Sequence, residues 1–144
     1  YPVKIILLGT YEEKLLLEKI GSFCSSENMV IVVKLDLAEI TQLIKVSQLF
    51  IGNDSGLLHV ASLAGTPVVG IFGPGQAATT GPFIDVKKQE IVTRNYPCSP
   101  CNQRFFEECE ASLHHKPECL ESISVKEVFE AIKKIVKRLE LFKK

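Results

Sequence analysis

The sequence predicts an α/β fold in which a parallel sheet lies between two layers of helices. Strand-like apolar runs alternate with helix-like segments, the runs are continuous, and the connections between them are short. Continuous apolar strands are typical of parallel sheets, which are covered on both faces. With 144 residues, 46% of them apolar, the chain can form one domain with its own core. We therefore expect a single domain over residues 1–144.

The first predicted unit is a strand within residues 3–9, VKIILLG, followed by a helix. Thr10 and Glu13 have the spacing of a capping box, which predicts that the helix begins there. Gly21 is its expected end. The apolar residues at helical spacing, which we expect to be buried, are Leu15, Leu16 and Ile20.

The second unit repeats this design, with a strand at 29–33, MVIVV, and a cap formed by Asp36 and Glu39. Later elements follow from the same patterns. They are a strand at 49–51, a helix at 55–64, a strand at 67–72 and a strand at 90–94.

Residues 73–82, GPGQAATTGP, contain three Gly and two Pro, which predicts a loop at a strand end. Residues 95–123 form an excursion that carries cysteines. Ser124 and Glu127 predict the cap of a closing helix over 124–142, which has an apolar stripe at a spacing of 3.6 residues.

Composition excludes some classes of function. Seventeen basic residues balance seventeen acidic ones, so no basic surface for nucleic acid is expected. The sequence shows neither an apolar run of membrane-spanning length nor a basic and apolar leader, so we expect a cytoplasmic protein. Because it starts Tyr1-Pro2-Val3 and its Met is Met29, we also expect it to be part of a longer protein.

A polar cluster stands between the strand at 49–51 and the next helix. Ligands of open parallel sheets bind beyond the carboxyl ends of the strands, where this cluster and residues 73–82 both lie. Backbone N–H groups at the start of the helix can hold an anionic oxygen. Gly56 lets a ligand approach closely. The cluster consists of Asn53, Asp54, Ser55 and Gly56.

His59 lies one turn after Ser55 on the same helical face and can donate a hydrogen bond to a bound phosphate. Asp54 would then cap the helix or bind ligand hydroxyls. A second interpretation needs no ligand: Asp54 or Ser55 is an ordinary N-cap, and His59 is a partly buried helix residue.

Residues 52–74, GNDSGLLHVASLAGTPVVGIFGP, closely resemble the signature D-S/T-G-x-x-H-x-A-x-x-x-G-x-P-x-x-x-x-F/Y-G-P of glycosyltransferase family 9, the lipopolysaccharide heptosyltransferases. KIILLGTYEEKLLLEKI is similar to the second βα unit of that family's C-terminal domain. YPCSPC, a later CL and the closing helix are similar to the tail of many members. The resemblance covers nearly all of the chain.

This resemblance implies the C-terminal, donor-binding, Rossmann-like domain of a GT-B enzyme. Such enzymes transfer heptose with inversion from an ADP-heptose-type nucleotide sugar to a lipid A-linked sugar, without a required metal. The residues that match the motif are implied to contact the donor's sugar and diphosphate: Asp54, Ser55, Gly56 and His59. Gly73 and Pro74 are implied to shape the pocket wall.

The family's acceptor domain, expected to supply the catalytic base, has no counterpart in the sequence, so no catalytic residue is assigned. The first βα unit of the donor domain, which carries a basic donor-contacting residue, has no counterpart either. We therefore expect the isolated chain to be inactive. In the usual strand order that first strand is central, so either another piece fills its place or the sheet closes differently.

Four cysteines in the excursion have the spacing C-x2-C-x7-C-x9-C, with His114 and His115 nearby. Four soft ligands can hold a structural zinc ion in a segment with little core. Reduced thiols and disulfides are the alternative interpretations. The cysteines are Cys98, Cys101, Cys109 and Cys119.

The closing helix and the end of the chain are basic. The positive residues suit contact with the inner membrane, where a lipid-linked acceptor lies. Lysines on a solvated helix face are the more common explanation of such a pattern. They are Lys126, Lys133, Lys134, Lys137, Arg138, Lys143 and Lys144.

Three other functions fit the same residues. The first is another GT-B enzyme, such as a UDP-sugar epimerase, which would prefer uracil to adenine. The second is a non-catalytic interaction module stabilised by zinc, which would bind no nucleotide. The third is a nucleotide-sensing regulator, which would bind ADP without transferring a sugar.

Overall fold

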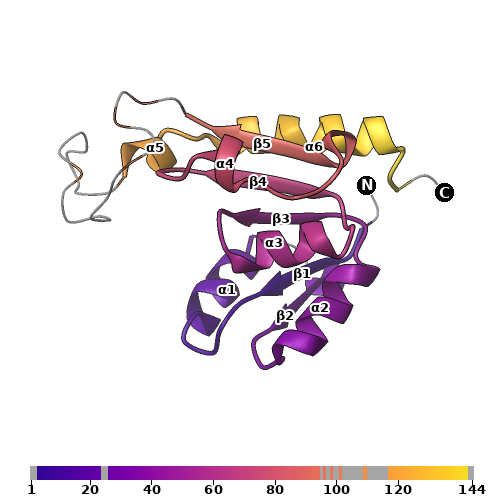
Figure 1. Cartoon of the computed structure of the whole chain (residues 1–144). Helices are drawn as coiled ribbons and strands as arrows, with labels where there is room; N and C mark the ends of the chain where they lie inside the picture. Colours follow the sequence, from indigo (N-terminus) through magenta and orange to yellow (C-terminus); the bar gives the residue numbers. More distant parts are fainter. Residues whose placement is uncertain are drawn as a thin grey trace. The chain divides into compact units, whose positions relative to one another are not determined.

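The computed structural model describes residues 3–23, 26–94, 96, 98, 101, 109 and 117–142. Parallel strands with flanking helices confirm the predicted α/β class (Figure 1). The chain divides into two compact units, Tyr1–Gln42 with Phe142–Lys144, and Leu43–Leu141. Each unit is described by itself below.

The first unit contains β1 (Ile5–Leu8), α1 (Lys14–Gly21) and β2 (Met29–Val32), with a 3-10 turn at Ser26–Asn28. β1 pairs in parallel with β2, so that Ile5 lies opposite Met29. α2 (Leu37–Val46) begins in this unit, and its predicted cap is confirmed. The Asp36 amide donates to Glu39 Oε2 over 2.9 Å, and the Glu39 amide donates to Asp36 Oδ1 over 2.8 Å.

The predicted start and buried face of α1 were wrong. A turn at residues 11–13 precedes the helix, Glu13 is the N-cap, and only half of the capping box forms, from the Thr10 amide to Glu13 Oε2. Leu17 and Gly21 are buried. Consecutive leucines allow more than one helical face, and Gly21 selects this one because its lack of a side chain admits Met29. The three residues that were predicted to be buried are exposed: Leu15, Leu16 and Ile20.

The second unit contains a three-stranded parallel sheet in the order β3-β4-β5. The strands are β3 (Phe50–Asn53), β4 (Val68–Phe72) and β5 (Gln89–Thr93). The helices that lie wholly within the unit are α3 (Gly56–Leu63), α4 (Ala77–Thr80), α5 (Glu118–Glu121) and α6 (Val125–Leu139), and Val86–Lys88 form a 3-10 turn.

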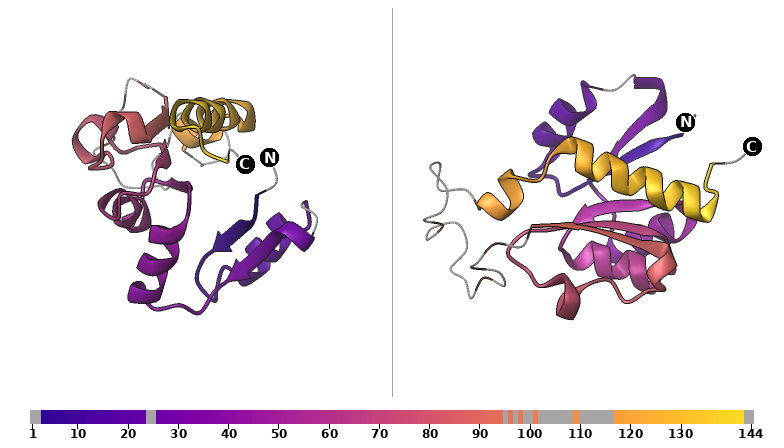
Figure 2. Two further views of the ribbon diagram at one scale, coloured as in Figure 1. Left: turned by 90° about the vertical axis from the view of Figure 1, so that its right-hand side faces the viewer. Right: turned by 90° about the horizontal axis from the view of Figure 1, so that it is seen from above.

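α3 and α6 cover opposite faces of this sheet (Figure 2). Gly70 lies beneath Leu58 of α3, whereas the next residue, Ile71, lines a cavity with α6. Consecutive strand residues point to opposite faces, so the sheet lies between the two helices. β4 is buried on both faces, as its apolar sequence predicts, with Val68 and Val69 fully buried.

Burial on both faces was a wrong prediction for the strand within residues 3–9, because Ile5 and Ile6 of β1 are exposed. Ile51 of β3 is exposed as well. Both strands lie at the edge of their sheets in the described chain, whereas β4 is central. A continuous apolar run therefore identified the strands but not their degree of burial.

The segment at residues 73–82 was predicted to be entirely loop, but it contains the one-turn helix α4. Its Gly and Pro residues flank the helix, and the Gln76 carbonyl accepts hydrogen bonds from the amides of Thr79 and Thr80. The capping box of α6 is confirmed: the Ser124 amide donates to Glu127 Oε2, and the Glu127 amide donates to Ser124 Oγ. Among the described residues, no helix has both the length and the apolar character needed to cross a bilayer.

Candidate functional site

The polar cluster lies where β3 ends and α3 begins, next to the loop that follows β4. The Asp54 amide donates a 2.9 Å hydrogen bond to the carbonyl of Ile71 in β4, which joins the two strand ends. A Cβ added to Gly75 would overlap Asp54 Oδ2, so the Asp54 carboxylate lies directly against the loop. The two predicted segments therefore meet at the carboxyl edge of the sheet.

Ser55 occupies the N-cap position of α3 with an extended backbone, φ −152° and ψ 166°. Within the described part of the chain, its side chain makes no capping hydrogen bond. The first amides of α3 thus lack the usual hydroxyl acceptor. Beside them, the position of a Cβ on Gly56 has no described atom within 4 Å, so there is open space at the positive end of the helix.

His59 faces Asp54, with 4.0 Å between its Nε2 and Asp54 Oδ1. The His59 side chain is 41% exposed and that of Asp54 is 29% exposed, so neither belongs to the core. When His59 is protonated the two form an ion pair. Asp54 therefore points toward His59 and Gly75, and within the described structure its carboxylate makes no hydrogen bond that caps α3.

Gly73 is buried, and a Cβ on it would overlap Leu120 of α5. The Pro74 carbonyl accepts a 3.0 Å hydrogen bond from the amide of Cys101. Both residues thus join the loop after β4 to the cysteine-bearing segment. This contact with α5 was not expected from the sequence.

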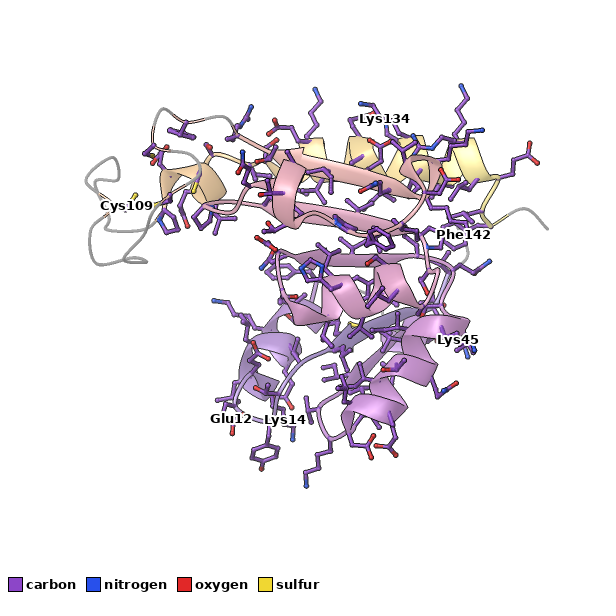
Figure 3. The ribbon with its side chains drawn as sticks, viewed as in Figure 1. Glu12, Lys14, Lys45, Cys109, Lys134 and Phe142 are labelled. Atoms are coloured by element: carbon purple, nitrogen blue, oxygen red, sulfur yellow. The ribbon has the colours of Figure 1, made fainter. Side chains whose placement is uncertain are left out.

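The cysteines differ in their surroundings. Cys98 and Cys101 are exposed, and Cys109 and Cys119 are half-buried; Figure 3 shows Cys109 at the end of the unit where α5 lies. Burial raises the pKa of the Cys119 thiol, and the neighbouring Cys109 raises it further. In the described ranges, no three side chains of metal-binding type converge on one point. His114 and His115 lie outside the described residues.

A cavity of about 440 Å³ opens between the sheet and the first turns of α6. Sequence reasoning missed it, and of the polar cluster only Asn53 is among its described lining residues. Its rim includes Val125 and Phe129, which are 87% and 54% exposed. The apolar stripe of α6 is wider than the face that the sheet buries, and this width was the available signal.

Arg94, which follows β5, was also missed. Its Nη2 donates to the Ser122 carbonyl over 3.1 Å and pairs with Glu127. Hydrogen bonds from the Ser124 amide and hydroxyl, and then the charge of Arg94, hold the pKa of Glu127 below its usual value. Arg94 Nε and Ser122 Oγ are buried without a hydrogen-bond partner among the described residues.

Several charges of α6 have partners within the protein. Lys133 pairs with Glu130 at 2.6 Å. Arg138 pairs with Glu90 at 2.6 Å. It also donates to the carbonyl of Lys87, which precedes β5, and to that of Gln89, the first residue of β5. Lys134 lies on the outer face of the helix (Figure 3). Lys143 and Lys144 lie outside the described residues. These contacts favour a solvated, partly structural role for the basic face.

Comparison with known sequences gives one family. A model described as glycosyltransferase family 9 (heptosyltransferase) matches residues 3–110. Lipooligosaccharide heptosyltransferase 2 of Campylobacter jejuni serotype O:6 is 32% identical over 102 residues, which are 71% of this chain and 30% of that protein. Lipopolysaccharide heptosyltransferase 1 of Pseudomonas aeruginosa is 28% identical over 75 residues, 52% of this chain and 21% of that protein. The chain thus spans less than a third of these relatives.

Solved structures share the fold. The structure of E. coli ADP-heptose lps heptosyltransferase II matches with a TM-score of 0.72 and 19% identity, covering 95% of this chain and 37% of that chain. A glycosyl transferase family 9 structure from Veillonella parvula also has a TM-score of 0.72, with 20% identity and the same coverage. These matches confirm a Rossmann-like α/β fold.

Proposed function

Because the chain belongs to glycosyltransferase family 9, we propose that it is the donor-binding part of an enzyme that transfers heptose from an ADP-heptose-type nucleotide sugar to a lipopolysaccharide core acceptor. The chain spans 30% of a curated relative, and we assign the acceptor site and the catalytic base to parts of the enzyme outside it. Residues 1–144 then act as one donor-binding domain. Residues 95–123 are its cysteine-bearing excursion, and 124–142 are its closing helix.

The uncapped start of α3 carries this proposal. Its amides, at Ser55, Gly56 and the next residue, would donate hydrogen bonds to the diphosphate of the nucleotide sugar in the open space beside Gly56. Holding the diphosphate there stabilises the negative charge that develops as it leaves the sugar. His59 would donate a hydrogen bond to the diphosphate, and Asp54 would accept hydrogen bonds from hydroxyl groups of the nucleotide sugar. Gly73 and Pro74 would form the adjoining wall.

Ligand-observed NMR of the chain with ADP, UDP and GDP tests this proposal. We expect preferential signals with ADP that weaken in Ser55→Ala and His59→Ala. Thr41→Ala, a half-buried change on α2 in the first unit, serves as the control that leaves them unchanged. A preference for UDP would instead support the epimerase-like alternative. No signal with any nucleotide, from a chain shown by circular dichroism to be folded, would contradict donor binding and favour the interaction module.

The four cysteines are proposed as a structural zinc set, and no step of the transfer passes through them. Their soft sulfur donors suit zinc. In the described structure no three of these side chains are close enough together to hold a metal ion, so binding would require the cysteines to move closer to one another. Native mass spectrometry of the purified chain would show one zinc ion that is lost in Cys119→Ser. A mass without metal after zinc addition would leave these residues as thiols or disulfides.

A peripheral contact with the inner membrane is proposed through Lys126, Lys134 and Lys137, which are exposed on α6. Arg138 is excluded from this contact because its guanidinium is bound to Glu90 and to backbone carbonyls. Sedimentation with vesicles containing anionic lipid would show binding that falls with added salt and with Lys134→Glu. Equal sedimentation of both proteins would contradict the contact.

A further inference from the structure

Gly75, in the loop between β4 and α4, requires an explanation other than backbone conformation. Among the described glycines, positive φ occurs at Gly65, so the backbone of Gly75 lies outside the left-handed region that favours glycine. What a side chain there would meet is the Asp54 carboxylate. An added Cβ overlaps Oδ2 and lies 3.4 Å from Cγ of Asp54, with Phe72 Cδ1 next at 3.7 Å. Because Gly75 has no side chain, the Asp54 carboxylate can occupy the space that a Cβ at position 75 would fill.

Asp54 is constrained on three sides. Its amide is bonded to the carbonyl of Ile71, which fixes the backbone relative to β4. Its Oδ1 lies 4.0 Å from His59 Nε2, and its Oδ2 lies against Gly75. A methyl group at position 75 would overlap Oδ2, so the carboxylate would have to rotate into another orientation.

We infer that Gly75 is a positioning residue that keeps the Asp54 carboxylate directed toward His59, beside the open start of α3. The inference rests on the proposed donor site for its functional consequence. It also assigns different roles to two glycines of the same loop, Gly73 and Gly75. Gly73 leaves room for Leu120, an apolar packing contact, whereas Gly75 leaves room for a charged group of the candidate site.

The two glycines therefore differ in what substitution should change. The atom that Gly75→Ala displaces is the free end of a side chain that is 29% exposed, so Asp54 can rotate away at little cost in stability. Gly73→Ala instead overlaps the branch of Leu120 on α5, and buried overpacking is costly. We expect Gly75→Ala to keep the melting temperature of the wild type and Gly73→Ala to lower it.

The first readout needs no ligand. Proton–carbon NMR of the chain should show the His59 ring signals shifted in Asp54→Asn and shifted alike in Gly75→Ala. In the double variant the shift should be no larger, because both changes act on one carboxylate. Leu63→Ala, at the exposed last residue of α3, is the control that leaves these signals in place. His59 signals that stay unchanged in Gly75→Ala, or that ignore Asp54→Asn, would overturn the inference.

The second readout is ADP affinity by calorimetry. Gly75→Ala should weaken binding by about tenfold, as expected for one lost hydrogen bond to a charged group, and should add little to Asp54→Asn. If the wild type binds ADP and Asp54→Asn weakens it while Gly75→Ala does not, the positioning role is wrong. If the wild type does not bind ADP but the His59 signals move as expected, the donor proposal fails and the positioning of Asp54 stands.

Discussion

Arg94 and Glu127 form an ion pair of 2.7 Å between Nη2 and Oε1, which joins the end of β5 to the first turn of α6. The same guanidinium donates to the carbonyl of Ser122, so the chain that leaves the sheet after β5 returns to it at the start of α6. Glu127 also accepts the Ser124 amide, which completes the capping box. One carboxylate thus serves both the cap and the closure of the excursion.

Acid should weaken the fold partly through Glu127. The Ser124 hydrogen bonds and Arg94 hold its folded-state pKa below the usual value of 4.5. A depressed pKa adds stability above the unfolded-state value, and that stability is lost as pH falls through the folded-state value. Glu127→Gln should therefore be less stable than the wild type at pH 7, with the difference shrinking below pH 4.5. Urea unfolding at a series of pH values measures this; a pH-independent difference would contradict it.

Two nearby serines should respond oppositely to removal of the hydroxyl. Ser124→Ala deletes the N-cap of α6 and should lower the free energy of unfolding by about 1 kcal/mol. Ser122→Ala removes a buried hydroxyl without a hydrogen-bond partner in the described structure, so it should be neutral or slightly stabilising. Urea unfolding of both variants gives the comparison. Equal losses would mean that the Ser122 hydroxyl has a partner.

Gly56→Ala should separate stability from ligand binding. The position of its Cβ is open, and alanine favours a helix, so the free energy of unfolding should stay the same or rise by up to about 1 kcal/mol. A methyl group there would enter the space proposed for the diphosphate, so ADP signals in ligand-observed NMR should weaken. Undiminished binding by a stable variant would place the diphosphate elsewhere.

The exposed apolar side chains at the cavity rim should bind a hydrophobic dye. Val125→Lys and Phe129→Lys should each reduce the fluorescence of anilinonaphthalene sulfonate added to the folded chain, because they remove exposed apolar surface beside a cavity. Leu63→Lys is the matched control, since Leu63 of α3 is exposed but is not among the lining residues. An equal reduction in this control would show that the dye does not select the cavity.

Much of the fold could be predicted from local signals. The caps at Asp36 and Ser124 were found because each depends on two residues three positions apart. The buried face of α1 could not be found, because it depends on the contact of Gly21 with Met29 of the next strand. α4 was missed because its glycines and prolines flank the helix and do not interrupt it.

The candidate site was predicted at the level of residues but not of contacts. Helical spacing placed Ser55 and His59 on one face of α3, but the approach of His59 Nε2 to within 4.0 Å of Asp54 Oδ1 was not predicted. The sequence analysis missed contacts between residues far apart in the chain. They are those of Asp54 with Gly75, Gly73 with Leu120, and Arg94 with Ser122. A pattern within one segment carries no information on such pairs. The spacing of the cysteines likewise left zinc, reduced thiols and disulfides open, because spacing along the chain does not give the separations of the side chains.

The burial of β4, at every residue except the half-buried Ile71, has a consequence for partial unfolding. Its amides lie in ladders with β3 on one side and β5 on the other, beneath helices on both faces. Amides of such a strand exchange with solvent only in the rarest openings. Since the Asp54 amide is bonded to Ile71 and Gly75 follows three residues after Phe72, the candidate site is attached to this slowest-opening strand. Fluctuations that release α6 while α3 stays on the sheet would therefore leave the attachment of Asp54 to β4 intact.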